Sequence, residues 1–155
     1  MLINHVGVTV GDLGAGVRWY REVFGLTVLA GPVETGLDGD AGERRSDIFG
    51  PRFARMRLAH LIDSSGVGIE MFEFIEPATG TPDEIFAYWK TGFSHVAFTV
   101  EDLEATRGKI TELGGRARTG VYQLANSDCR VCYCEDPWGT AIELSTRPYR
   151  TITLG

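Results

Sequence analysis

The stretch His5-Val-Gly-Val-Thr-Val-Gly-Asp-Leu13 decides the organisation of the chain, because it recurs as His95-Val-Ala-Phe-Thr-Val-Glu-Asp-Leu103. Six of these nine residues are identical between the two copies. A second, shorter repeat pairs Ile69-Glu70-Met71 with Ile142-Glu143-Leu144. The two motifs occur in the same order in each half of the chain, so the sequence predicts two modules that share one fold.

Each half has the pattern of a strand, a helix and three further strands. Alternating apolar residues over 3–10 and 93–100 indicate a strand, and Asp12 or Asp102 then stands where a helix N-cap is expected. The other expected strands are 26–30, 53–62 and 67–75 in the first half, and 116–119, 128–134 and 140–145 in the second. The predicted fold class is therefore α+β, with two tandem βαβββ modules.

We assign residues 1–76 to the first module and residues 93–147 to the second, with a tail over 148–155. Residues 31–50 are rich in Gly, Asp and Arg and lack apolar periodicity, so we expect a loop insertion that covers the functional site. Residues 77–92 are the expected linker. Within the linker we expect a short helix over 83–89 and burial of three aromatic side chains, Phe86, Tyr88 and Trp89.

Side chains of a strand alternate between its two faces, so His5 lies on the face opposite the valines that follow it. The same alternation places His95, Glu70 and Glu143 opposite the apolar neighbours that should pack beneath helices. Two imidazoles and two carboxylates suit Zn, Ni, Co, Mn or Fe and leave positions open for water or a substrate oxygen. We therefore expect one divalent metal ion at His5, Glu70, His95 and Glu143, with a metal-free pocket as the alternative.

Five further residues lie on strands next to the expected ligands and are candidates for the site or for packing. Arg55 and Arg57 either face the cavity, where they would hold a carboxylate or phosphate of the substrate, or lie in solvent. His60 has the opposite parity and is assigned to packing, because the apolar residues of its strand share that parity. Phe72 and Phe74 share the parity of the preceding glutamate, and they either belong to the core or line an apolar substrate pocket.

The three cysteines, Cys129, Cys132 and Cys134, lie on one expected strand. Side chains two residues apart on a strand are separated by about 6.6 Å, which is too far for a disulfide. A zinc site would need further ligands, and the chain has only these three cysteines, so strand packing is the better interpretation. Free thiols fit a reducing compartment, and we expect a cytoplasmic protein.

The net charge and the hydropathy argue against binding to nucleic acid and against insertion into a membrane. The formal charge of −6 repels a phosphodiester backbone, so we expect no nucleic acid partner. The sequence contains no uncharged apolar run of about 18 residues, so we expect no membrane-spanning segment. A small-molecule substrate remains the expected partner.

At these residues the sequence resembles the vicinal oxygen chelate superfamily. Its members pair two βαβββ modules around a concave metal-binding cavity and place metal ligands on the first and last strands of each module. The resemblance rests on the ordered set of His5, Glu70, His95 and Glu143, together with Glu135-Asp-Pro-Trp-Gly-Thr-Ala-Ile-Glu-Leu144. It covers nearly all of the chain. The four-ligand set is most similar to those of glyoxalase I and methylmalonyl-CoA epimerase.

This resemblance implies a metal-dependent lyase, isomerase or epimerase that moves a proton next to a carbonyl oxygen bound by the metal. It also implies Glu143 as the leading base, Glu70 as its alternate, and a homodimer. An extradiol-type dioxygenase is an alternative, although Glu70 would fill a position that oxygen or a catechol uses. A metal-free protein of the same fold that binds a small molecule, such as a drug, is the other alternative.

Overall fold

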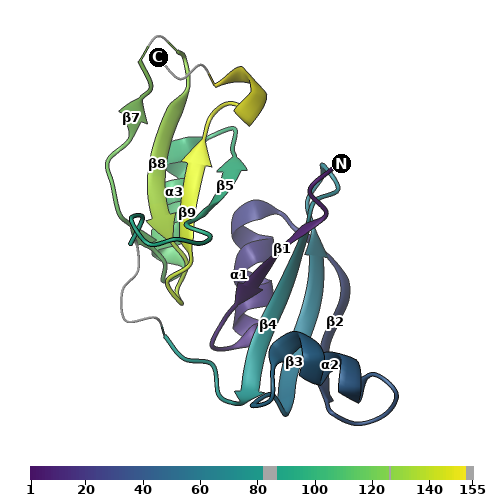
Figure 1. Cartoon of the computed structure of the whole chain (residues 1–155). Coiled ribbons are helices and arrows are strands. Elements are labelled where there is room, and N and C mark those ends of the chain that lie inside the picture. The colour runs from purple at the N-terminus through teal and green to yellow at the C-terminus, as the bar shows by residue number, and fades with distance from the viewer. Residues whose placement is uncertain (82–86, 126, 153–155) are drawn as a thin grey trace. The chain divides into compact units, whose positions relative to one another are not determined.

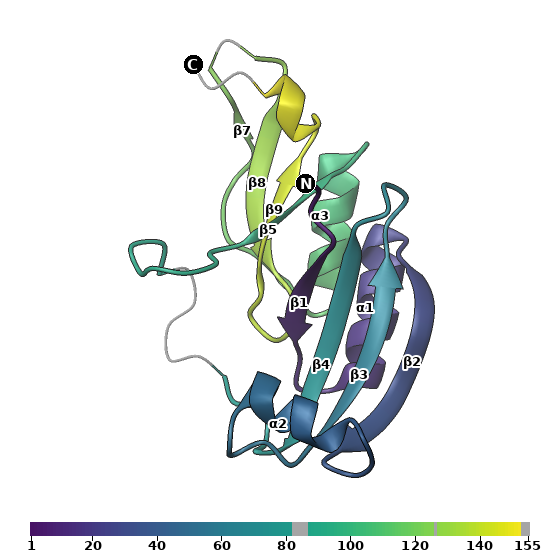
Figure 2. The ribbon, with the colours of Figure 1, turned by 45° about the vertical axis from the view of Figure 1, so that its right-hand side comes forward.

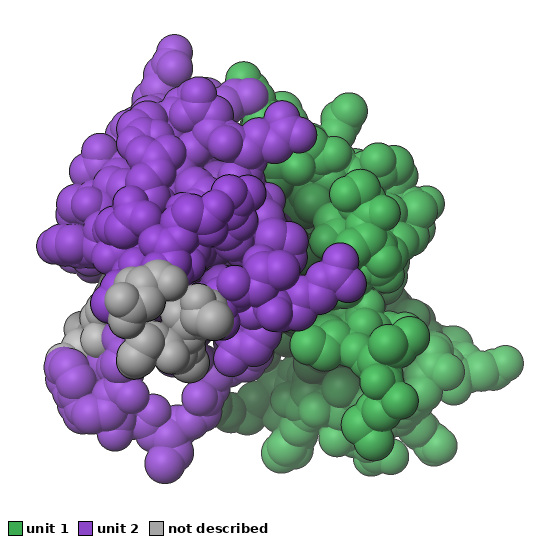
Figure 3. Space-filling model, turned by 90° about the horizontal axis from the view of Figure 1, so that it is seen from above, with its two compact units in different colours: residues 1–80 green, residues 81–155 purple. Residues whose placement is uncertain are grey.

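The computed structural model describes residues 1–81, 87–125 and 127–152 (Figure 1). The chain divides into two compact units, Met1–Gly80 and Thr81–Gly155, which Figure 3 colours separately. The helices of the described residues are all too short or too polar to cross a lipid bilayer.

Unit 1 is a four-stranded sheet with a helix against one face (Figure 2). The strand order is β1-β4-β3-β2, with β1 parallel to β4 and the other neighbours antiparallel. Its elements are β1 (His5–Thr9), α1 (Leu13–Phe24), β2 (Thr27–Gly36), α2 (Gly42–Phe49), β3 (Arg55–Ile62) and β4 (Gly68–Glu76).

Helix α1 begins where the sequence predicts. The carboxylate of Asp12 accepts a hydrogen bond from the backbone N–H of Ala15 at 2.8 Å, which satisfies a donor of the first turn. Gly25 ends the helix in the left-handed conformation, with φ of 69°. The helix lies close to the sheet, since a Cβ on Gly16 would stand 2.9 Å from the sulfur of Met71. Helix α1 therefore covers the sheet face that carries the apolar residues of β1 and β4.

The segment 31–50 is not the open loop that its composition suggests. Strand β2 continues to Gly36, and residues 42–49 form α2. The ring of Phe49 lies 5.8 Å from that of Phe72 and 5.6 Å from that of Phe74. Aromatic contacts thus hold α2 against the face of β4 opposite α1. Apolar periodicity could not reveal this helix, because a single aromatic residue provides these contacts.

Unit 2 repeats the arrangement with shorter strands. Its strand order is β5-β9-β8-β6, with β7 also paired to β8, and β5 runs parallel to β9. Its elements are β5 (Val96–Thr99), α3 (Leu103–Glu112), β6 (Arg116–Ala117), β7 (Tyr122–Gln123), β8 (Arg130–Glu135), β9 (Ala141–Ser145) and the 3-10 helix η1 (Tyr149–Thr151). Asp102 caps α3 by accepting from the N–H of Ala105 at 2.9 Å. The α+β fold with two related units is confirmed.

The cysteines have the packing role expected from their spacing. All three belong to the described residues, and each is buried with a free thiol. Cys132 and Cys134 share one face of β8, and the neighbouring strand β9 contributes buried Ile142 and Leu144. Together these side chains form the apolar layer of unit 2 on which α3 packs.

The linker prediction was only partly correct. Most of the expected helix over 83–89, including Phe86, lies outside the described residues. The prediction that Trp89 is buried was wrong, because 76% of the residue is exposed. The prediction that Tyr88 is buried was also wrong, because the residue is 42% exposed, although its ring lies 5.7 Å from the ring of His95. Adjacent side chains in a turn diverge, so one of the two aromatic residues contacts the rings of unit 2 while the other lies in solvent.

We predict that Asp102→Ala lowers the free energy of unfolding by about 1 kcal/mol, because it removes the N-cap acceptor of α3. Asp102→Asn keeps an acceptor and should change stability little. Urea denaturation of both variants tests this, with Glu101→Ala as a control at the exposed position before the cap. Equal unfolding midpoints for Asp102→Ala and Glu101→Ala would contradict the cap assignment.

Candidate functional site

Each unit places one histidine beside one glutamate on the sheet face away from its helix. In unit 1, Nε2 of His5 lies 3.5 Å from Oε2 of Glu70. In unit 2, Nε2 of His95 lies 3.0 Å from Oε2 of Glu143. The parallel pairing of the first and last strands produces both contacts. It brings Glu70 of β4 beside His5 of β1, and Glu143 of β9 beside His95, which directly precedes β5. The structure thus brings together the predicted residues of each unit as a pair.

The residue before each histidine orients the ring. Oδ1 of Asn4 lies 2.7 Å from Nδ1 of His5, and the hydroxyl oxygen of Ser94 lies 3.0 Å from Nδ1 of His95. A neutral His5 that donates from Nδ1 to Asn4 has an unprotonated Nε2 facing the carboxylate. In that tautomer neither Nε2 nor the carboxylate oxygen carries a hydrogen, so two atoms with lone pairs face each other at 3.5 Å. Such a pair is suited to bind a cation.

Glu143 has a second partner on the neighbouring strand. The hydroxyl of Tyr133 donates to Oε2 of Glu143 at 3.2 Å, because β8 and β9 place these residues directly opposite each other. Burial, followed by the charge and hydrogen bond of Glu143, raises the pKa of Tyr133 from 10.0 to about 12. The phenol therefore stays protonated and remains a hydrogen-bond donor to the carboxylate at neutral pH.

Aromatic rings surround His95. Its imidazole centre lies 5.7 Å from the ring of Tyr88 and 5.6 Å from the ring of Tyr133. The two tyrosine rings are themselves 6.0 Å apart and nearly perpendicular. Burial and the charge of Glu143 raise the pKa of Tyr88 as well. These rings restrict the orientation of His95 and shield the His95–Glu143 pair, whose side chains are 26% and 17% exposed.

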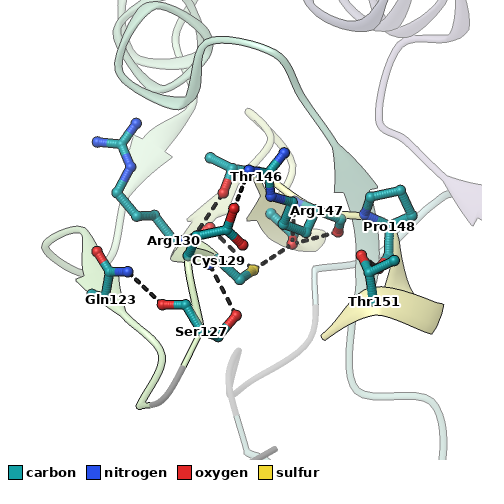
Figure 4. A network of polar contacts seen from close by, with 10 residues as sticks. Gln123, Ser127, Cys129, Arg130, Thr146, Arg147, Pro148 and Thr151 are labelled. Carbon is teal, nitrogen blue, oxygen red and sulfur yellow. Dashed lines mark hydrogen bonds and ion pairs between the residues drawn. The ribbon is translucent and has the colours of Figure 1, made fainter. Parts of the chain in front are cut away.

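The strand that carries Glu143 is fixed at both ends. Before β9, the carboxylate of Asp136 accepts from the backbone N–H of Trp138 at 2.9 Å and of Thr140 at 2.8 Å, which closes the turn from β8. At the end of β9, the hydroxyl of Ser145 lies 3.2 Å from the sulfur of Cys129 and donates to the carbonyl of Arg147 at 2.9 Å. Figure 4 shows the polar contacts around Cys129 and Arg147. These contacts hold the register that places Glu143 opposite Tyr133.

Unit 1 adds a residue that the sequence had assigned to packing. His60 on β3 pairs directly with Glu70 on β4, and its Nδ1 lies 4.0 Å from Oε1 of that carboxylate. Asn4, His5, His60 and Glu70 line a hollow of about 380 Å³, which also includes Leu29, Leu61, Ile62, Gly66, Gly68 and Ile69. The side chain of His60 is 43% exposed there, so the packing prediction does not describe its surroundings.

Arg55 and Arg57 do not face this hollow. Arg57 pairs across the strands with Glu73, whose Oε2 accepts from the backbone N–H of Leu13, the first residue of α1. Both arginines also lie near Glu34, at 3.6 Å and 3.3 Å. They are therefore on the helix-covered side of the sheet, because Ala59 and Leu61, which share their parity, are buried there. Of the two alternatives for these arginines, the structure matches exposure to solvent, because their side chains are 53% and 49% exposed.

Phe72 and Phe74 lie on the same face as Glu70, farther along β4. Their rings contact Phe49 of α2, and Phe74 also contacts Phe53, which is only 3% exposed. The rings therefore belong to an aromatic cluster that joins α2 to the sheet. A role in lining a substrate pocket remains a proposal.

Each unit by itself brings together only two of the four predicted metal ligands. Across residues 1–81, 87–125 and 127–152, no three His, Cys, Asp or Glu side chains are grouped so that they could hold a metal ion. Unit 1 provides the His5–Glu70 pair and unit 2 provides the His95–Glu143 pair. Each unit therefore provides two of the four predicted metal ligands.

Sequence reasoning missed two residues of these surroundings, Tyr133 and His60. A signal for both was present in the turns. Tyr133 and Glu143 are equally distant from the centre of the turn over 136–140, and His60 and Glu70 are equally distant from the centre of the turn over 63–67. Residues equidistant from a tight turn pair across a hairpin, so counting outward would have placed each ring opposite its glutamate.

Comparisons with known proteins identify similar chains. The family model described as Glyoxalase/Bleomycin resistance protein/Dioxygenase superfamily matches residues 2–144. A 2-epi-5-epi-valiolone epimerase from Actinomyces sp. is 28% identical, over 94% of this chain and 79% of its own. A probable lactoylglutathione lyase from Synechocystis sp. is 25% identical, over 93% of this chain and 94% of its own.

Solved structures share the fold. The crystal structure of a glyoxalase family protein from Bacillus cereus superposes with a TM-score of 0.75 at 23% identity. The match covers 92% of this chain and 91% of that one. At this level of identity the likeness extends to the arrangement of strands and helices.

We predict that Tyr133 ionises with a midpoint of about 12 in chelator-treated protein, since burial and Glu143 disfavour the phenolate. The difference between wild type and Tyr133→Phe in a rapid-mixing titration of tyrosinate absorbance gives this midpoint. The contribution of Tyr133 to stability is fully present below pH 10.0 and is lost as the pH rises to about 12, because the unfolded chain ionises first. A difference curve centred at 10 would contradict the buried contact.

Proposed function

Because the chain belongs to the Glyoxalase/Bleomycin resistance protein/Dioxygenase superfamily, we propose that it is a metal-dependent enzyme acting on a small molecule. The reaction moves a proton at a carbon next to a carbonyl group, as a glyoxalase-like lyase or isomerase or as an epimerase. The observation that supports this most is the repeated pairing of a histidine Nε2 with a glutamate carboxylate on the open face of each unit. The names of two relatives, a lyase and an epimerase, agree with this class.

The proposed ligands of one divalent metal ion are His5, Glu70, His95 and Glu143. Two imidazoles and two carboxylates suit Zn, Ni, Co, Mn or Fe, and the facing acceptor atoms of each pair fit a cation. When bound, such an ion supplies Lewis-acid stabilisation of negative charge on the substrate oxygen beside the reacting carbon. Each chain contains one His5–Glu70 pair and one His95–Glu143 pair, so we expect one metal ion per chain. This ratio is the same if the four ligands come from one chain or from two chains of a homodimer.

Glu143 is the proposed base that accepts the proton from carbon and returns it. Tyr133 donates a hydrogen bond to its Oε2 and thereby fixes the orientation of the carboxylate. The rings of Tyr88 and Tyr133 reduce the access of water to the pair, which strengthens electrostatic interactions within it. These surroundings support Glu143 over Glu70, whose side chain is more exposed, at 29% against 17%.

Glu70 is the alternate base. Its Oε2 faces His5, its Oε1 faces His60, and all three line the hollow of unit 1. A carboxylate in that position reaches a substrate from a different element than Glu143 does. An epimerase that takes a proton from one side of a carbon and returns it on the other needs two such groups. Glu70 and Glu143 are therefore the two candidates for an epimerisation.

We predict about one divalent ion per wild-type chain prepared without chelator, and substantially less in His95→Ala, because the variant loses one of two neutral donors. Elemental analysis of both proteins measures this. The matched control is Arg57→Gln, which changes the opposite face of the sheet in unit 1 and should keep the ion. Stoichiometric metal in His95→Ala, or none in the wild type, would show that the assignment is wrong.

We predict that Glu143→Gln keeps most of the metal but slows exchange of the substrate α-proton with deuterated water by about 10²- to 10⁴-fold, since the amide cannot act as the base. Glu70→Gln should slow exchange less. Proton NMR follows the exchange with thiohemiacetals of 2-oxoaldehydes, acyl-CoA thioesters and 2-epi-5-epi-valiolone as candidate substrates.

Two further assays, of oxygen consumption with a catechol and of small-molecule binding, could give results that replace the proposed function. Consumption of oxygen with a catechol, without proton exchange on any candidate substrate, would support the dioxygenase alternative. Tight binding of a small molecule by wild-type protein that holds no metal would support the binding-protein alternative.

A further inference from the structure

The position opposite each glutamate carries a ring with a polar atom directed at the carboxylate. In unit 1 this residue is His60 of β3, opposite Glu70. In unit 2 it is Tyr133 of β8, opposite Glu143. Each carboxylate therefore lies between the histidine of the first strand and a ring from the adjacent hairpin strand. A residue with a ring thus occupies the same hairpin position opposite the glutamate in both units.

In unit 1 the two imidazoles approach different oxygens of Glu70. Nε2 of His5 lies 3.5 Å from Oε2, and Nδ1 of His60 lies 4.0 Å from Oε1. The separation of 4.0 Å exceeds a hydrogen bond, so the contact is electrostatic in this geometry. The nitrogen of His60 that lies nearest to the carboxylate is Nδ1, and it faces Oε1. Oε2 then remains directed at His5.

Packing alone does not account for a histidine at this position. The side chain is 43% exposed and lines the hollow with Asn4 and His5. The neighbouring residues of the same face, Leu58 and Ile62, are apolar and only partly buried. An apolar side chain would therefore serve the sheet equally well, whereas the imidazole of His60 gives Oε1 of Glu70 a polar neighbour.

We propose that His60 is a positioning residue for Glu70, a role that rests on the metal site of the proposed function. His60 holds Oε1 and so fixes the rotation of the carboxylate, which directs Oε2 toward the donor atom of His5. Tyr133 contacts Glu143 from the equivalent strand position, but by a hydrogen bond of 3.2 Å to Oε2, the oxygen that also faces His95. Partners of metal-ligating carboxylates restrict their orientation, and removal of such a partner typically weakens metal affinity about 10- to 100-fold.

The test compares two replacements of His60 in the full chain. His60→Asn places an amide N–H close to the position of Nδ1. His60→Leu replaces the imidazole with an apolar side chain of similar size. The matched control is Ile62→Val, which trims the same strand face beside the hollow without changing a polar group. Co²⁺ is the probe, because its affinity can be measured by competition with a chelator and its visible absorption reports ligand geometry. Thermal unfolding of the metal-free proteins checks that all variants fold.

We expect His60→Leu to weaken Co²⁺ binding about 10- to 100-fold and to alter the visible spectrum, and His60→Asn to restore most of both. Ile62→Val should match the wild type. Unchanged affinity and spectrum in His60→Leu, with a wild type that binds Co²⁺, would overturn the role of His60 and leave the metal site intact. Equal losses in His60→Leu and His60→Asn would also overturn it, because they would indicate that His60 itself is a ligand. A wild type that binds no Co²⁺ would overturn the proposed function.

Discussion

The parallel pairing of the first and last strands in each unit is the constraint on which the candidate site depends. It places His5 and Glu70, or His95 and Glu143, on the same sheet face, within 3.5 Å and 3.0 Å of each other. A slip of one residue in the last strand would turn each glutamate toward the helix-covered face. Burial of Met71 beneath α1 and of Leu144 in the layer under α3 opposes that slip. Apolar packing on one face thus determines where the carboxylates lie on the other.

The two pairs share a backbone frame and differ in their surroundings. Glu143 lies beside the rings of Tyr88 and Tyr133 and accepts a hydrogen bond from the latter. Glu70 lies in a more open hollow between His5 and His60. The enclosed carboxylate is better protected from water, while the exposed one has room for a ligand. A repeated fold can in this way supply two equivalent donors and still assign them different roles.

The sequence predicted the features that depend on short-range patterns. The repeated motif and the caps at Asp12 and Asp102 led to the α+β fold with two related units, and strand parity led to the histidine and glutamate pairs. Strand parity gave the wrong face for the side chains of β3, because apolar residues occur there at both parities. The buried Ala59 and Leu61 determine which face packs on α1. Helix α2 was missed because its contact with the sheet comes from Phe49 and from strand residues distant in sequence. Counting outward from the turns would have corrected the placement of His60.

X-ray absorption spectroscopy of the protein loaded with one equivalent of Zn²⁺ tests the central claim most directly, because it identifies the atoms around the ion. Coordination by His5, Glu70, His95 and Glu143 predicts a shell of nitrogen and oxygen atoms at about 2.0–2.2 Å, with scattering from two imidazole rings. The three thiols are buried, and two of them lie in the apolar layer under α3, so no sulfur should appear in that shell. Sulfur atoms near 2.3 Å, or a shell without imidazole scattering, would contradict the account.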